Sequence, residues 1–379
     1  MVKKIFQKDI VVIGAGASGL MFASMCKNKN IAIIEANDKI AKKVLVSGGG
    51  KCNITNHYIS IENFLGDIEF IKDVALDSSF RDVLNFFDEL EFVKIKKNQY
   101  FCKSGADSVV KSLLKRVDKK GIYLKQKVLD VDFIDGKFYT YTQNSTFISK
   151  KLVVASGGVS YPQLGVSDIA YEIAKKFGHK VTKLKPALVG FTVQKDDFWM
   201  KNLSGISLPV KINVGEKTFY DDLLFTHRGI SGPAVLNASL YWEKGSIEID
   251  FLPKQKLFFK NKNRQISSNL PLAKRFIKEF LKKLDLKDKV VKDLTKSELE
   301  KLKLLKSYRL APAGDFGYKK AEVTKGGIRV DEIDSKNMQS KLQKGLYFLG
   351  ECLDITGELG GYNLHFAYAG AKKLCFNFS

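Results

Sequence analysis

An apolar run followed at once by a patterned glycine cluster constrains this chain more than any other feature. DIVVIGAGASGLMFASMC, residues 9–26, predicts a strand, a tight turn and a helix, and IAIIEA, residues 31–36, predicts the next strand. In this pattern Gly14 permits the turn, Gly16 lets the backbone approach a pyrophosphate, and Gly19 allows the helix to pack closely on the strand. The segment therefore predicts a βαβ unit that opens a doubly wound α/β fold and binds a dinucleotide.

An acidic residue and a second glycine cluster indicate which dinucleotide is bound. Glu35 ends the second predicted strand, where its carboxylate can accept a hydrogen bond from a ribose hydroxyl and would repel a 2′-phosphate. SGGGKCN, residues 47–53, cannot be a helix, because each glycine there costs about 1 kcal/mol relative to alanine. Three glycines remove side chains, so main-chain groups can lie against a flat ring system. This favours a flavin over a nicotinamide as the resident cofactor.

Two later segments agree with a flavin dinucleotide. KLVVASGG, residues 151–158, predicts a buried strand that ends in small residues, where the chain can pass close to a cofactor. KGLYFLGECLD, residues 344–354, predicts another apolar strand, and Asp354 beyond it can bind hydroxyls of a ribityl chain. GGYN, residues 360–363, opens a predicted helix whose N-terminus carries about half a positive charge. Aimed at the N1/C2=O edge of a flavin, that charge would favour acceptance of electrons.

The rest of the chain predicts further elements. Helices are expected at 78–92 and 105–119, and a hairpin is expected to turn at Asp135-Gly136. After Pro186 the residue pattern changes to that of short β-strands, and a strand pattern appears again at 321–333. Between them two helices are predicted, at 272–284 and 295–307, the second with a capping box formed by Thr295 and Glu298.

Composition excludes several classes of protein. The five cysteines lack CxxC spacing, which argues against a disulfide framework and a zinc site, and we expect no metal and a reducing, cytoplasmic location. No run of about 18 apolar residues is present, so no transmembrane helix is expected. Polar residues at positions 7–9 interrupt the first apolar stretch, so we do not interpret it as a secretion signal.

The net charge of +22 is unevenly distributed. Residues 254–309 hold 18 basic and 6 acidic side chains, and lysine alternates there with Leu, Phe and Ile at helical spacing. A nucleic acid or an anionic membrane is one interpretation of such an excess. The spacing favours the other interpretation, the solvated outer faces of amphipathic helices.

Together these motifs resemble the aminoacetone-oxidase-like (BaiN-type) family of FAD-dependent oxidoreductases, within the two-dinucleotide-fold flavoproteins related to glutathione reductase. The resemblance spans nearly the whole chain. It is carried by the segments IGAGASG, KKVLVSGGGKCNITN, ASGGVSYPQLG, FGHKVTKLKPALVGF, FTHRGISGPAVLNAS and YFLGECLDITGELGGYNLHFAYAGA.

The resemblance implies a Rossmann-like FAD-binding domain interrupted by an inserted β-barrel-like domain and a small helical subdomain. On this basis we expect the FAD-binding domain at 1–185 and 334–379, the β-rich insertion at 186–253 and 320–333, and the helical subdomain at 254–319. The resemblance also implies FAD contacts from Gly14, Gly16, Ala17, Ser18, Gly19, Glu35, Ala36, Lys43, Ser47, Gly48, Gly49, Gly50, Cys52, Asn53, Val128, Ala155, Gly157, Gly350, Asp354, Gly361, Asn363 and Leu364.

Three residues are candidates for orienting a substrate or moving a proton. Lys51 can steady charge on flavin or substrate, and it stands where the resembled family usually has arginine. His227 lies in a polar turn, FTHRGISGP, of the inserted part. His365 follows GGYN, where the family commonly has glutamine. Cys52 has no second cysteine nearby, so we expect packing or flavin contact there rather than disulfide chemistry.

The sequence favours an FAD-dependent oxidoreductase acting on a small organic molecule, by amine oxidation or by reduction of an enone or ketone, in a cleft between the FAD domain and the insertion. Two alternatives stay open, a flavoprotein that acts on or binds RNA and a non-catalytic flavin-binding scaffold. NAD(P)H is a candidate transient electron donor, although a second complete GxGxxG motif is absent. The substrate, the electron acceptor and the oligomeric state are left open.

Overall fold

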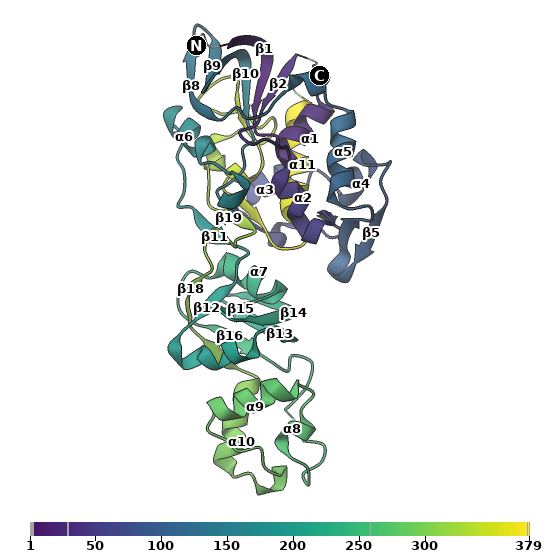
Figure 1. The fold of residues 1–379 in the computed structure, drawn as a ribbon, viewed down its shortest axis with the longest axis vertical. Helices are drawn as coiled ribbons and strands as arrows, with labels where there is room; N and C mark the ends of the chain where they lie inside the picture. The colour runs from purple at the N-terminus through teal and green to yellow at the C-terminus, as the bar shows by residue number, and fades with distance from the viewer. Residues whose placement is uncertain (1–3, 29, 258, 377, 379) are drawn as a thin grey trace. The chain divides into compact units, whose positions relative to one another are not determined.

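The architecture comes from a computed structural model that describes residues 4–28, 30–257, 259–376 and 378. Contacts between residues divide the chain into two units, both visible in Figure 1. The first comprises Met1–Lys185 and Val323–Ser379, and the second comprises Pro186–Glu322. The first unit is therefore discontinuous in sequence, and the second is inserted into it.

A seven-stranded sheet forms the centre of the first unit, in the order β7-β2-β1-β10-β9-β8, with β20 also paired to β10. The first half of β10 pairs antiparallel with β9, and its last three residues pair parallel with β20. All of β2 and the last four residues of β1 are buried, as expected for parallel strands covered on both faces. The strands are β1 (Lys4–Ile13), β2 (Ile31–Ile34), β7 (Ile122–Tyr123), β8 (Val128–Ile134), β9 (Lys137–Thr142), β10 (Ser145–Val154) and β20 (Leu346–Phe348).

Helices and two small sheets surround this central sheet. Helix α1 packs against α11, although the two are far apart in sequence (Figure 1). The helices are α1 (Ala17–Met25), α2 (Lys42–Val46), α3 (Ile68–Val74), α4 (Phe80–Phe86), α5 (Ala106–Lys115), α6 (Ile169–Lys176) and α11 (Tyr362–Cys375). In one small sheet β6 (Gln99–Cys102) lies between β3 (Asn53–Asn56) and β5 (Phe92–Ile95), and in the other β21 (Ile355–Gly357) pairs with β4 (Phe64–Gly66).

The second unit is built on an antiparallel, barrel-like sheet in the order β17-β16-β13-β14-β15-β12-β18. Its interior is aromatic and continuous with the helices that follow, because Phe225 of the sheet and Phe251, just after it, both pack on Phe276 of α9. The strands are β12 (Phe191–Val193), β13 (Ser207–Val214), β14 (Lys217–Thr226), β15 (Gly229–Ser231), β16 (Ile247–Asp250), β17 (Tyr308–Leu310) and β18 (Pro312–Asp315). The helices are a 3₁₀ helix (Lys195–Leu203), α7 (Pro233–Tyr241), α8 (Ile266–Asn269), α9 (Lys274–Lys283) and α10 (Lys296–Leu302).

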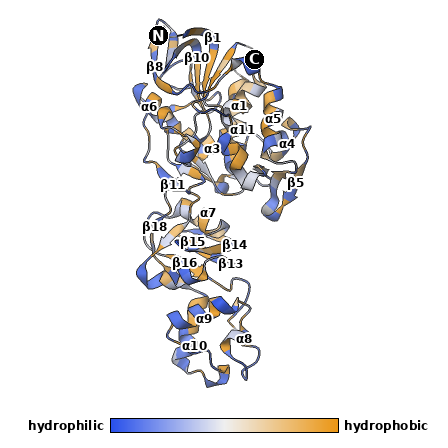
Figure 2. Cartoon of the chain, viewed as in Figure 1, coloured by the Kyte–Doolittle hydropathy of each residue, from blue (hydrophilic) through white to orange (hydrophobic). Residues whose placement is uncertain are grey.

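Hydropathy follows these layers. In Figure 2 the hydrophobic colour runs along β1 and β10, whereas α9 and α10 carry both colours. The mixed colour of α9 reflects its alternation of apolar and charged residues, and the apolar Phe276, Ile277, Phe280 and Leu281 are the buried positions. Among the described residues, no helix combines the length and the apolar character needed to cross a bilayer.

The structure confirms several predicted elements and corrects two. The first βαβ unit is confirmed, as are the hairpin turn, with Asp135 and Gly136 both at positive φ, and the capping box of Thr295 and Glu298. The helix predicted at 78–92 is wrong beyond Phe86, because Phe92 already begins β5.

The strand conformation predicted at 321–333 is also mostly wrong. It yields only β19 (Val323–Lys325), because Gly326 and Gly327, with φ of 84° and 156°, turn the chain away from an extended conformation. Contacts place the residues from Val323 onward in the first unit, since Thr324 Oγ1 accepts hydrogen bonds from the backbone N–H groups of Val159 and Ser160.

Candidate functional site

The first glycine loop has the geometry of a pyrophosphate cradle. At Gly14, whose φ is 106°, a Cβ would lie 2.5 Å from the carbonyl oxygen of Ala155, and at Gly19 a Cβ would lie 2.0 Å from the carbonyl oxygen of Gly14. At Gly16 a Cβ would meet nothing within 4 Å. The outer glycines therefore bring strand and helix together, whereas the middle glycine faces open space.

The start of α1 is left free to bind an anion. No side chain caps this helix at Gly16, and its first turn contains no acidic residue. The first N–H groups of a helix have no partner within the helix, so the amides of Ala17 and Ser18 can donate to a phosphate. This donor set fits the pyrophosphate of a dinucleotide.

Glu35 holds the loop from the end of β2. Its Oε2 accepts a hydrogen bond from the backbone N–H of Ala15 at 3.0 Å, and its Oε1 accepts from the backbone and side-chain N–H groups of Asn37, both at 2.9 Å. These bonds fix the carboxylate beside the glycine loop while Glu35 remains partly exposed. A ribose hydroxyl stays the predicted partner of this carboxylate.

The second glycine cluster is a left-handed turn. Gly48, Gly49 and Gly50 have φ of 56°, 66° and 83°, values that cost a residue with a Cβ about 1–2 kcal/mol each. A Cβ on Gly48 would lie 3.0 Å from the Phe101 ring, whereas one on Gly49 would meet nothing within 4 Å. Backbone conformation therefore requires glycine at three successive positions, and the middle of the turn presents bare main chain.

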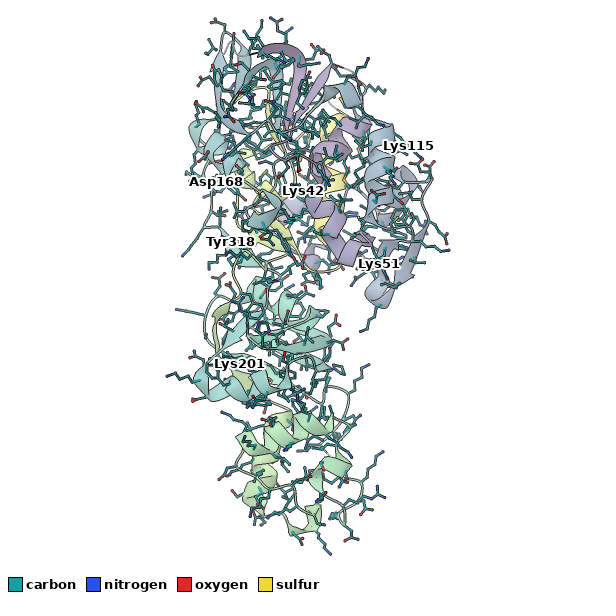
Figure 3. The ribbon with its side chains drawn as sticks, in the orientation of Figure 1. Lys42, Lys51, Lys115, Asp168, Lys201 and Tyr318 are labelled. Carbon is teal, nitrogen blue, oxygen red and sulfur yellow. The ribbon has the colours of Figure 1, made fainter. Side chains whose placement is uncertain are left out.

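The residues after this turn differ in exposure. Lys51 lies on the surface, where Figure 3 labels it. Cys52 is fully buried, and burial raises the pKa of its thiol to about 12. The thiol is therefore protonated at neutral pH, which argues against its use as a nucleophile. Asn53, at the start of β3, sits beside Gly361, where a Cβ would lie 2.7 Å from Asn53 Oδ1.

The segment after β20 reaches back to the first glycine loop. Gly350 has φ of 74°, and a Cβ there would lie 2.0 Å from Ser18 Oγ. Beyond it, burial raises the pKa of Asp354, while a hydrogen bond with Thr182 acts in the opposite direction. A half-buried carboxylate of this kind fits a role in accepting hydrogen bonds from ligand hydroxyls.

Helix α11 begins in the same way as α1, with a glycine N-cap, no capping side chain and no acidic residue in its first turn. Asn363 closes a ring with Gly357, since its Oδ1 accepts from the Gly357 N–H and its Nδ2 donates to the Gly357 oxygen, both at 2.9 Å. The Asn363 side chain thus holds the loop, and the free amides at the start of α11 are left to a ligand.

The three residues considered for catalysis lie in different surroundings. His365 is fully buried, with Nδ1 2.8 Å from Thr55 Oγ1 and Nε2 3.0 Å from the Ala75 oxygen. Burial lowers its pKa, so the ring is neutral at physiological pH. His227 lies on an exposed turn of the second unit. Of these three candidates, Lys51 belongs to the first unit and is exposed.

The remaining predicted contacts are found in the same unit. Gly157 has φ of 77° and faces open space, Val128 and Ala155 are buried, and Leu364 is partly buried in α11. Lys43 Nζ lies 2.6 Å from Glu351 Oε2, and Glu351 Oε1 accepts from the Thr324 N–H at 2.9 Å. Sequence reasoning missed Glu351, although a charged residue three positions after the end of a buried strand was a usable signal.

Contacts among these segments bring separate parts of the sequence together. The first glycine loop meets the end of β10 and the segment after β20, and the SGGG turn leads into β3, which meets the start of α11. Within the described residues, no three histidine, cysteine or acidic side chains are grouped so as to hold a metal ion. The two glycine loops and the uncapped helix starts fit a dinucleotide with a flat ring at one end.

Fold and site together define a flavoprotein oxidoreductase that binds FAD in a Rossmann-type domain. Comparison with known families agrees. The chain belongs to the family described as "HI0933-like protein Rossmann domain", whose profile matches residues 8–374.

Three relatives match over nearly their full length. A ribosomal RNA dihydrouridine synthase of Haemophilus influenzae is 35% identical and covers 97% of this chain and 98% of its own. One of Escherichia coli with the same name is 34% identical over 96% of each chain. A 3-dehydro-bile acid delta(4,6)-reductase of Clostridium scindens is 27% identical over 95% of this chain and 96% of its own.

Proposed function

We propose that this flavoenzyme reduces the C5=C6 double bond of uridine in ribosomal RNA. The observation that carries the proposal is the similarity, at 35% and 34% identity over almost the whole chain, to two proteins named ribosomal RNA dihydrouridine synthases. The net charge of +22 is a second support, because an RNA substrate is a polyanion. The similarity and the net charge together favour RNA as the substrate more strongly than the net charge alone.

One reaction class connects the differently named relatives. Uracil contains a carbon–carbon double bond conjugated with the C4 carbonyl, and a 3-dehydro substrate of a delta(4,6)-reductase is likewise an unsaturated ketone. In both cases the double bond becomes a single bond when the carbon remote from the carbonyl gains a hydride and the carbon next to the carbonyl gains a proton. A single type of site can therefore serve both substrates, with specificity set elsewhere on the protein.

Bound FAD, once reduced, supplies the hydride equivalent. NAD(P)H is the electron donor that we propose, which balances the reaction, since one hydride and one proton are consumed for each uridine reduced. The chain contributes the free amides at the start of α1 and α11, which would hold the pyrophosphate and the flavin edge of the bound cofactor. The bare turn of Gly48–Gly50 leaves room for the ring.

We assign to Lys51 the role of a positive charge close to the reacting base. It is exposed and directly follows the SGGG turn. Its ammonium can stabilise negative charge that develops on the C4 oxygen of uracil while C6 accepts hydride. His365 cannot exchange protons with a substrate from its buried position without breaking its bonds to Thr55 and Ala75, so we assign it a role in holding β3 against α11.

The test is to treat unmodified, transcribed ribosomal RNA with the purified holoenzyme and NADH or NADPH. We expect digestion and mass spectrometry to reveal a nucleoside heavier than uridine by two hydrogen atoms. Reactions without nicotinamide, and reactions with the Gly16→Val variant, serve as controls and should yield none. Reduction of small unsaturated ketones by an enzyme that leaves every uridine intact would support the small-molecule alternative instead.

A further inference from the structure

The inserted unit carries its positive charge in one part only. Residues 254–309 contain 18 basic and 6 acidic side chains, whereas residues 186–253 contain 6 basic and 8 acidic ones. The barrel-like portion is therefore slightly acidic, and the helical portion supplies the excess.

Helix α9 divides its surface into three faces with different uses. Phe276, Ile277, Phe280 and Leu281 are buried in the core of the second unit.

A second face holds the helix against the 3₁₀ helix Lys195–Leu203. There Arg275 donates to the Asn202 oxygen, Glu279 accepts from Asn202 Nδ2 at 2.9 Å, and Lys283 Nζ donates to the Asp196 oxygen at 2.7 Å. The cations on this face are used within the unit.

The third face of α9 consists of Lys274, Lys278 and Lys282, which are spaced four residues apart and therefore lie about 6 Å from one another along the helix. All three side chains are exposed, and within the described part of the chain none of their ammonium groups has an ion-pair or hydrogen-bond partner. Like charges at this spacing destabilise an isolated helix by about 0.2–0.5 kcal/mol per pair. The fold itself gains nothing from this row of charges.

Other basic side chains of residues 254–309 also lack a partner among the described residues. The exposed basic residues whose side chains lack such a partner among the described residues are Lys254, Lys256, Lys260, Lys262, Arg264, Lys287, Lys292, Lys296 and Arg309. Together with the three lysines of α9 they form what we call the basic surface. No acidic side chain of the described residues forms an ion pair with it.

We propose that the basic surface binds the phosphate backbone of RNA and contributes most of the affinity for the substrate. The proposal rests on the proposed function, since it names the part of the chain that recognises that substrate. Lysine suits such a role, because it contacts phosphates as a point charge without reading sequence. An anionic membrane fits less well, because the apolar face of α9 is committed to the core and cannot insert among lipids.

The experiment compares two variants that lose the same charge. K274Q/K278Q/K282Q removes the third face of α9, and K119Q/K137Q/K150Q removes three exposed lysines of the first unit that likewise lack a partner among the described residues. Binding of labelled, transcribed ribosomal RNA to each holoenzyme is measured by fluorescence anisotropy from about 50 to 200 mM KCl. FAD content and the rate of flavin reduction by NAD(P)H report whether each variant is folded.

We expect the α9 variant to bind RNA about tenfold or more weakly at the lowest salt, with a salt slope shallower by about two, as loss of three phosphate contacts predicts. The first-unit variant should stay within about threefold of the wild type. Equal losses in both variants, or no loss in the α9 variant, would overturn the inference.

The outcomes also separate this inference from the proposed function. A wild-type enzyme that converts uridine while the α9 variant binds RNA equally well refutes the basic surface alone. A wild-type enzyme that binds no RNA at about 50 mM salt refutes both. Binding to phosphatidylserine vesicles without binding to RNA assigns the surface to a membrane and refutes the RNA proposal.

Discussion

Lys43 Nζ lies 2.6 Å from Glu351 Oε2 and so joins α2 to the segment after β20, across 308 positions of sequence. The other oxygen of Glu351 accepts from the Thr324 N–H at 2.9 Å. The pair is only partly exposed, at 33% for Lys43 and 20% for Glu351. One carboxylate therefore ties three separate segments together beside the glycine loops.

Substitution of Glu351 tests this tie. Glu351→Ala removes both bonds and should lower the free energy of unfolding by about 1–2 kcal/mol and weaken FAD retention. Glu351→Gln keeps an acceptor for the Thr324 N–H and should lose less. Urea denaturation and FAD absorbance measure the two effects. Glu69→Ala, which breaks an exposed ion pair with Lys72, is the matched control and should change stability by at most about 1 kcal/mol.

The two glycines of the first loop should respond differently to a side chain. Gly16→Val adds atoms to open space, so the protein should fold with nearly the melting temperature of the wild-type apoprotein but lose the flavin absorbance near about 450 nm. Gly19→Val puts a Cβ 2.0 Å from the Gly14 oxygen and should prevent correct folding. A Gly16→Val protein with full FAD content would refute the pyrophosphate assignment.

Lys51 should matter through its charge. We expect Lys51→Ala to slow oxidation of the reduced enzyme by substrate about tenfold, which corresponds to a loss of ~1.4 kcal/mol, and Lys51→Arg to retain most of the rate. Single-turnover absorbance of the flavin measures this step directly. Equal rates for Lys51→Ala and the wild type would remove Lys51 from the mechanism.

Protonation of His365 should destabilise the fold. Burial lowers its pKa below that of the unfolded chain, so between about pH 6.5 and the folded pKa the unfolded state binds the extra proton. Stability should therefore fall as pH falls through this window, by up to about 1.4 kcal/mol per pH unit. Of the neighbouring charged groups, Asp82 opposes the shift and Lys372 reinforces it.

The variant His365→Gln isolates this contribution. Glutamine offers a donor and an acceptor for Thr55 and the Ala75 oxygen but does not titrate. Urea denaturation between about pH 7 and 5 should show a shallower decline in stability for the variant than for the wild type. Identical pH profiles would contradict a buried neutral ring.

Local chemistry made much of the site predictable. Gly14 and Gly48–Gly50 have positive φ and Gly19 packs closely on the strand, so backbone geometry favours glycine at these positions. Gly16 faces open space and follows instead from the pattern of the dinucleotide motif, and the buried strand before Glu35 carries its own pattern. The end of helix α4 was not predictable in this way. Its apolar spacing continues past Phe86, but the helix ends there, and β5 pairs with β6 in a hairpin. That hairpin is held in turn by β3, which is distant in sequence and pairs with β6.

By itself the sequence determined the glycine turns, the βαβ unit and the bare helix starts, because these depend on conformations that only particular residues adopt locally. Tertiary structure decided the rest. It buried His365 behind Thr55 and joined Glu351 to Lys43. It also left the side chains of Lys274, Lys278 and Lys282 without a partner among the described residues, while their neighbours pack in the core. Such outcomes depend on which distant segments meet, and a periodic pattern carries no information about its partner.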